Sequence, residues 1–179
     1  FKNRKLEDAK NLCFEIIEVD SNNISALNLL GIILFQKKEF KEAIKIIKKS
    51  IKIDPKQPDV NNNLGLMLAN LKKYNDAISY YKRAIKINDR FIDAYFNLGI
   101  TYKELGITDK AIFYWEKVIK IQPKSFQAYN NIGNIFLEKN KDILAIKYYD
   151  KAISLNKNFY LAYFNRGNAL QKLGKLNES

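Results

Sequence analysis

The stretch Tyr95-Phe96-Asn97-Leu98-Gly99-Ile100-Thr101-Tyr102 carries the pattern that decides the fold. It places Leu-Gly between two aromatic residues, and it is followed by the run 111–115 (Ala-Ile-Phe-Tyr-Trp) and by Pro123. Five glycines repeat at a spacing of 34 residues, namely Gly31, Gly65, Gly99, Gly133 and Gly167. Four alanines keep the same spacing, namely Ala43, Ala77, Ala111 and Ala145. A fixed period of this length indicates a repeat architecture.

The glycines lie inside apolar, helix-periodic runs, so they need a packing reason. A glycine in a helix interior costs about 0.5–1 kcal/mol relative to alanine. Without a side chain, the first helix of each repeat can press its backbone against the second helix, and the small alanines allow the same approach from the other side. The sequence therefore predicts that the glycine and alanine rows meet between the two helices of each repeat.

The two remaining glycines share another register. Gly106 and Gly174 follow predicted first helices, where a left-handed residue commonly ends a helix. Asn140, Lys38 and Lys72 occupy the same register in other repeats. We therefore predict a left-handed turn at each of these five positions.

In order and spacing these residues resemble the tetratricopeptide-repeat family along nearly the whole chain. The resemblance implies an all-α fold, a right-handed superhelical α-solenoid of antiparallel helix pairs with a 34-residue repeat. It also implies that the first helices line the concave side. We predict a single array with these parts: 1–23, the second helix of a truncated repeat; 24–57, repeat 1; 58–91, repeat 2; 92–125, repeat 3; 126–159, repeat 4; 160–179, the first helix of a truncated repeat 5.

Composition excludes several classes of function. The 179 residues include no histidine and one cysteine, so His-dependent triads and multi-cysteine zinc sites are excluded. Cys13 holds the register of Tyr81, Trp115 and Tyr149, which predicts a buried, inert thiol. No apolar run is long enough to span a bilayer. We expect no enzyme activity in this chain, no cofactor, no metal and no membrane, with the location left open and an intracellular one favoured.

The net charge of +12 suggests an anionic partner, but its location matters more than its sum. The predicted first helices carry five basic and four acidic residues, so the excess falls on second helices and turns. The resemblance places those on the convex side. A solvated outer face is the favoured interpretation, and binding of an anion or nucleic acid by this basic face is the alternative.

Asparagines keep phase along the predicted first helices. An asparagine stands two residues before the glycine in four repeats, at Asn63, Asn97, Asn131 and Asn165, while Leu29 breaks the row in the first. Neighbouring registers add Asn28, Asn62, Asn130, Asn134 and Asn168, with Phe96 and Phe164 at the register of Asn28. An asparagine amide both donates and accepts, so it can pair with the backbone of an extended peptide of any sequence. These eleven residues are the predicted peptide-binding site.

The asparagine row resembles the inner surface of the repeat arm of the intracellular O-linked N-acetylglucosamine transferase, which grips protein substrates. The leading prediction is a protein-interaction scaffold that binds an extended peptide or partner segment in a concave groove. The alternative is the substrate-recruiting arm of a larger enzyme such as a glycosyltransferase. A bland polar surface is the competing interpretation. The lysine and arginine clamp of chaperone-tail binders cannot be assembled, because the matching registers hold Ser25, Asp59, Asp93 and Gln127.

The two terminal helices should each expose an apolar face. The first has a second-helix register and the last a first-helix register, so each lacks half of its repeat. We expect Ile16 at one end, and Leu170 and Leu173 at the other, to be exposed. End-to-end self-association is therefore possible, and it need not close into a ring.

Overall fold

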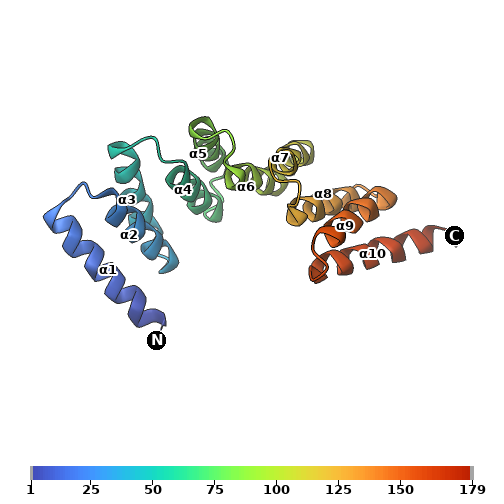
Figure 1. Ribbon diagram of the computed structural model, residues 1–179, viewed down its shortest axis with the longest axis horizontal. Coiled ribbons are helices and arrows are strands. Elements are labelled where there is room, and N and C mark those ends of the chain that lie inside the picture. The colour runs from blue at the N-terminus through green and yellow to red at the C-terminus, as the bar shows by residue number, and fades with distance from the viewer. Residues whose placement is uncertain (1, 178–179) are drawn as a thin grey trace. The chain divides into compact units, whose positions relative to one another are not determined.

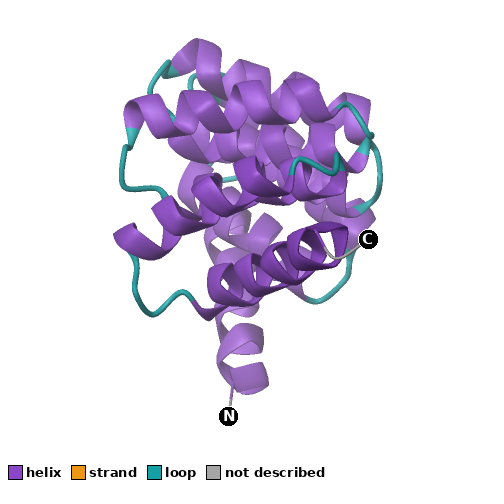
Figure 2. Cartoon of the chain, turned by 90° about the vertical axis from the view of Figure 1, so that its right-hand side faces the viewer, coloured by secondary structure: helices purple, strands orange, loops and turns teal. Residues whose placement is uncertain are grey.

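The computed structural model describes residues 2–177, with side chains described from residue 5 to residue 174. Within that part of the chain there are ten helices and no strand, so the predicted all-α class is confirmed (Figure 2). The helices are α1 (Lys2–Val19), α2 (Ile24–Gln36), α3 (Phe40–Ile53), α4 (Pro58–Asn70), α5 (Tyr74–Ile87), α6 (Ile92–Glu104), α7 (Thr108–Ile121), α8 (Phe126–Glu138), α9 (Asp142–Leu155) and α10 (Tyr160–Asn177). Figure 1 labels them along the chain.

The helices fall into two compact units. Unit 1 comprises Phe1–Ala94 and unit 2 comprises Tyr95–Ser179, so the boundary lies within α6. In unit 1, α2 packs against α3 and α4 against α5, while α1 packs on α2. In unit 2, α8 packs against α9, and α10 packs on α9. Each unit is thus built from consecutive helix pairs, as the 34-residue period predicts.

Turn chemistry sets the ends of these helices. The Asn23 side chain accepts a hydrogen bond from the Ala26 N–H at 3.0 Å and so caps α2. Pro58 begins α4, where its missing N–H costs nothing. The residues after the first helices are left-handed as predicted, with φ of 65° at Lys38, 59° at Lys72, 73° at Gly106 and 56° at Asn140.

Gly174 departs from this pattern, and the prediction of a helix stop there was wrong. Helix α10 continues through Gly174 to Asn177. In the other repeats a second helix follows and packs back onto the first, which holds the left-handed turn in place. Among the described residues nothing folds back onto α10 in this way, so the helix continues.

The second helix approaches the glycine closely in four repeats, but the group against the glycine is a large side chain and not the alanine that the sequence analysis predicted. A Cβ at Gly31 would lie 2.5 Å from Ile47, and one at Gly99 would lie 2.3 Å from Nε1 of Trp115. At Gly65 and Gly133 the corresponding distances to Tyr81 and Tyr149 are both 2.6 Å. The four alanines Ala43, Ala77, Ala111 and Ala145 are fully buried. Gly167 differs, because nothing lies within 4 Å of its added Cβ.

Aromatic side chains fill the space between the helices of unit 2. Tyr114 stacks on Tyr102 with ring centroids 5.4 Å apart, and Tyr148 stacks on Phe136 at 5.3 Å. Trp115 is buried, and its Nε1–H donates to the Phe96 carbonyl at 3.2 Å. These rings form part of the core between the helices, whereas Tyr163 of α10 is 45% exposed.

Cys13 and the apolar residues of the two terminal helices differ in burial. Cys13 is buried, and burial raises the pKa of its thiol, so the inert reading is supported. Ile16 of α1 and Leu170 of α10 are exposed as expected, whereas Leu173 is half-buried. None of the helices in the described residues is both long and apolar enough to cross a membrane.

Candidate functional site

The first helices of unit 2 are joined side by side through polar side chains. Lys103 of α6 forms an ion pair with Glu138 of α8 at 3.1 Å. The Asn165 amide on α10 donates to Oδ1 of Asn130 at 3.1 Å and to Oδ1 of Asn134 at 3.0 Å, both on α8. These bonds align α6, α8 and α10, and we call their solvent-facing side the first-helix face of unit 2.

Asn134 is also tied to the second helix of its own repeat. Its Oδ1 accepts a hydrogen bond from the Tyr149 hydroxyl at 2.9 Å. Burial raises the pKa of Tyr149 to about 12, with a further contribution from the Glu138 carboxylate, so the hydroxyl keeps its proton and donates. Part of the asparagine pattern therefore holds repeats together, which the sequence did not reveal.

The asparagines of this face differ in accessibility. Asn130 is 2% exposed, so it is part of the interior, although the sequence placed it among the exposed residues. Asn97, Asn131 and Asn165 are half-buried, and Asn168 is exposed. Asn131 makes no side-chain hydrogen bond with any described residue, which leaves its amide available to a ligand.

Unit 1 carries the corresponding residues on α2 and α4. The Asn28 amide donates to Oε1 of Gln57 at 2.9 Å, while its own Oδ1 is buried without a partner among the described residues. Asn62 is buried at 7% exposure, and Asn63 is half-buried. Asn130 accepts a hydrogen bond from Asn165 of the adjacent first helix, a contact that one helix considered alone cannot show.

Apolar side chains accompany the amides. Phe164 on α10 is 66% exposed and Ile100 on α6 is 40% exposed, whereas Phe96 is half-buried beside Trp115. Sequence reasoning missed Ile100, as it missed Leu29 and Leu66 in unit 1, which are 49% and 43% exposed. The repeat register could have revealed two of them, because Leu66 and Ile100 stand at the same repeat position as Asn134 and Asn168.

The titratable groups of the described residues do not form a reactive cluster. No group of three or more His, Cys, Asp or Glu side chains there could hold a metal ion. The resolved pKa shifts belong to exposed ion pairs, to Cys13 and to packed tyrosines such as Tyr114, whose pKa burial raises. The chemistry that this face offers is hydrogen bonding and apolar contact.

Family comparisons match most of the chain. Profiles described as TPR repeat match residues 67–106 and 133–174, and one described as tetratricopeptide repeat matches residues 92–125. A profile for anaphase-promoting complex, cyclosome, subunit 3 matches residues 2–84. No curated protein matches the sequence significantly.

Solved structures share the fold over most of their length. The crystal structure of MamA is similar with a TM-score of 0.80 and 29% identity, covering 87% of this chain and 91% of that chain. The crystal structure of YrrB, described as a TPR protein with an unusual peptide-binding site, is similar with a TM-score of 0.75 and 25% identity. That similarity covers 93% of this chain and 86% of YrrB.

Proposed function

Because the chain belongs to the tetratricopeptide-repeat family, we propose that it is a scaffold that binds an extended segment of a partner protein on its first-helix face. The fold is one typical of protein–protein interaction. The resemblance to YrrB, which has a peptide-binding site, supports a peptide as the ligand. In unit 2 the peptide would lie across α6, α8 and α10.

The observation that carries this proposal is a row of amides at a matched register, in which Asn131 makes no side-chain hydrogen bond with any described residue. Asn97, Asn131 and Asn165 follow one another at 34-residue steps on α6, α8 and α10. Packed helices lie about 8–10 Å apart, and an extended chain advances about 3.3 Å per residue. One asparagine therefore meets roughly every third residue of the peptide.

Exposed apolar side chains complete the proposed surface. Phe164 and Ile100 lie on the two outer helices of this face, with Asn131 on the helix between them. Each amide bond to the peptide contributes about 1 kcal/mol, so several bonds and some apolar burial are needed together. The ligand we expect has free backbone groups and at least one apolar side chain.

A binding titration tests the proposal. Peptides of about twelve residues selected from a random display library against the chain serve as probes. A peptide that meets an asparagine roughly every third residue needs about seven residues to reach all three, which leaves residues on either side for apolar contacts. Asn131→Ala should weaken their binding about fivefold, and Asn97→Ala with Asn131→Ala about tenfold or more. Asn158→Ala, an exposed turn residue of unit 2, is the matched control and should leave affinity unchanged. Unchanged affinity in the double variant contradicts the proposal.

The alternative is that this surface recruits substrates for a catalytic domain of a larger protein. It uses the same face and the same ligand class, so the titration does not separate the two. The sequence of the parent gene does. A catalytic domain encoded with these repeats supports recruitment, and its absence rules that role out.

A further inference from the structure

Unit 1 carries a second charged surface, on its second helices. Four basic side chains lie in the second half of α3 and in the turn that follows it, namely Lys48, Lys49, Lys52 and Lys56. Four more stand 34 residues later on α5 and its turn, namely Lys82, Arg83, Lys86 and Arg90. Seven of the eight are exposed, and Lys49 is half-buried. We call this set the basic face of unit 1.

No ion pair is found for the cations of this face within the part of the chain that the structure describes. None of the eight pairs with a carboxylate among the described residues, whereas Lys10 and Lys37 of the same unit pair with Glu39 and Glu7. Each segment holds one aspartate, Asp54 or Asp89. The Asp54 carboxylate accepts a hydrogen bond from the Lys56 backbone N–H at 2.8 Å, so it is used within its own turn. The face therefore keeps a strong positive potential.

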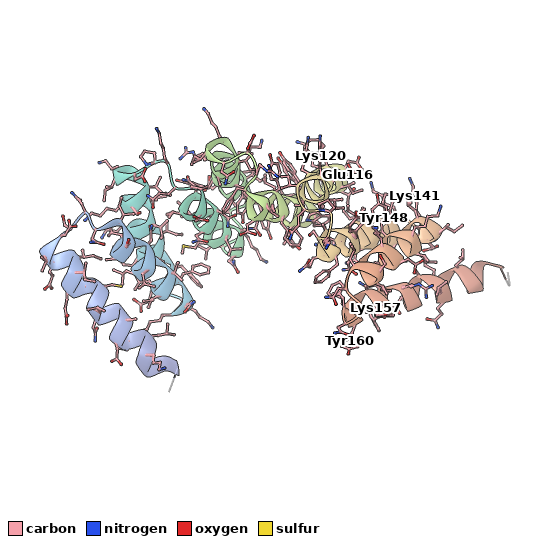
Figure 3. All side chains as sticks on the ribbon, viewed as in Figure 1. Glu116, Lys120, Lys141, Tyr148, Lys157 and Tyr160 are labelled. Atoms are coloured by element: carbon pink, nitrogen blue, oxygen red, sulfur yellow. The ribbon has the colours of Figure 1, made fainter. Side chains whose placement is uncertain are left out.

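The same registers in unit 2 provide an internal reference. Residues 116–124 contain three basic side chains and one acidic side chain, Glu116. Residues 150–158 contain two basic side chains and one acidic side chain, Asp150. Asp150 is further engaged by Nε of Arg166 at 2.5 Å. Figure 3 labels Glu116 and Lys120 on α7, an acidic and a basic side chain one turn apart. Basic residues near a helix C-terminus interact favourably with the helix dipole. That effect alone would enrich basic residues equally at the ends of α3, α5, α7 and α9.

A hollow lies within the basic face. It has a volume of about 290 Å³ and is lined by Ile51, Pro55, Asn61, Arg83, Lys86 and Ile87. The end of α3 and the end of α5 thus approach the same space, with two cations at an otherwise largely apolar wall. Ile53 and Ile87 are each 37% exposed beside the cations.

This combination favours an acidic protein segment over a nucleic acid. Single-stranded nucleic acid is held by aromatic side chains on which bases stack. The large apolar side chains exposed on α3 and α5 are isoleucines. Tyr80 is half-buried, and the Arg83 guanidinium lies over its ring, with 4.9 Å from Cζ to the ring centroid. Carboxylates would pair with the cations while apolar side chains enter the hollow.

We propose that the basic face of unit 1 binds an acidic, partly apolar segment of a protein partner. The eight basic residues of this surface belong to α3, α5 and their turns, so they share no residue with the first-helix face of unit 2. Opposite charges on the two partners speed their encounter and make binding sensitive to salt.

Fluorescence anisotropy with defined probes tests this proposal. The probes are a labelled peptide of about twelve residues repeating Glu-Glu-Ile and a labelled oligothymidine of about twelve nucleotides, each at about 50 and about 300 mM salt. The peptide should bind more tightly than the oligothymidine, and salt should weaken it. Arg83→Glu with Lys86→Glu should weaken peptide binding about tenfold or more.

Lys117→Glu with Lys120→Glu is the matched control, because it makes the same charge change at the same registers in unit 2. We expect it to change peptide affinity less than about threefold. Arg83→Gln with Lys86→Gln, a milder change at exposed positions, should give an intermediate loss. Equal losses in the unit 1 and unit 2 pairs, no peptide binding at low salt, or tighter binding of the oligothymidine would each overturn the proposal.

Discussion

Helices α8 and α10 present the same registers 34 residues apart, but among the described residues only α8 is followed by a helix that packs over its glycine. Tyr149 closes over Gly133, whereas Gly167 has open space beside it. Tyr129 and Phe136 of α8 contact Tyr148, while Tyr163 and Leu170 at the matching positions of α10 are 45% and 42% exposed. We infer from this comparison that the glycine contributes to stability only where a partner side chain fills the space that it leaves.

The largest effect is expected from removing the side chain that fills this space. Tyr149→Ala deletes a buried ring and its hydrogen bond to Asn134, so unit 2 should lose about 3–5 kcal/mol of unfolding free energy. Trp115 is the only tryptophan and lies in unit 2, so its fluorescence during urea unfolding reports on that unit. A loss below about 1 kcal/mol would mean that the contact at Gly133 is not a stabilising one.

Filling the space from the other side should have the next largest effect. A Cβ at Gly133 would lie 2.6 Å from the Tyr149 ring, so Gly133→Ala should destabilise unit 2 by about 1–3 kcal/mol despite the better helix propensity of alanine. The same urea unfolding experiment measures it. Wild-type stability in this variant would contradict close approach as the reason for the glycine.

A smaller effect concerns the Tyr149 hydroxyl alone. Tyr149→Phe removes its hydrogen bond to Asn134 and should cost about 1 kcal/mol near neutral pH. Burial raises the pKa of Tyr149 from 10 to about 12, so the unfolded chain loses this proton first. This stabilisation is complete below pH 10 and is lost as the pH rises toward about 12. Unfolding measured across that range should show a smaller decline in Tyr149→Phe than in the parent.

Gly167→Ala is the matched counterpart of Gly133→Ala and should act in the opposite direction. With nothing within 4 Å of the added Cβ, the alanine keeps its helix propensity and should stabilise α10 by about 0.5–1 kcal/mol. The readout is again unfolding followed by Trp115 fluorescence. A destabilisation similar to that of Gly133→Ala would show that the two positions are equivalent.

Weak self-association is the smallest effect that follows from the comparison. Leu12 of α1 is 56% exposed and holds the register of Tyr148, so α1 of one copy fits Tyr163 and Leu170 of another. Light scattering on the 179-residue chain should show an apparent mass that rises with concentration, and Tyr163→Asp with Leu170→Asp should reduce the rise. Arg90→Asp, an exposed residue in the turn after α5, is a control. A constant mass of one chain at high concentration would rule this association out.

Sequence reasoning succeeded where a residue's role depends on its own repeat. The spacing predicted a close approach of the next helix at Gly99 and Gly133, although not the large side chains that make the contact. It also predicted the left-handed residues Lys38 and Asn140, because each is followed by the next helix in the chain. It failed for Gly174, where that partner helix is not among the described residues.

The candidate site was harder to predict because the positions of its polar side chains depend on contacts with neighbouring repeats. Asn130 is buried, and Asn165 is bonded across to α8, because two first helices meet there. A single repeat contains no sign of those contacts. The exposed Ile100 was overlooked because the predicted site was chosen from the asparagines and two phenylalanines, although the register of Ile100 matches that of Asn134.

Site-specific photo-crosslinking tests the central claim, that ligand peptides bind on first helices, most directly. Benzoylphenylalanine would replace Gln127, an exposed residue of α8, or Lys151, an exposed residue of α9, in separate samples with a selected peptide. The account predicts a crosslink from position 127 and none from position 151. A crosslink from position 151 alone would contradict it.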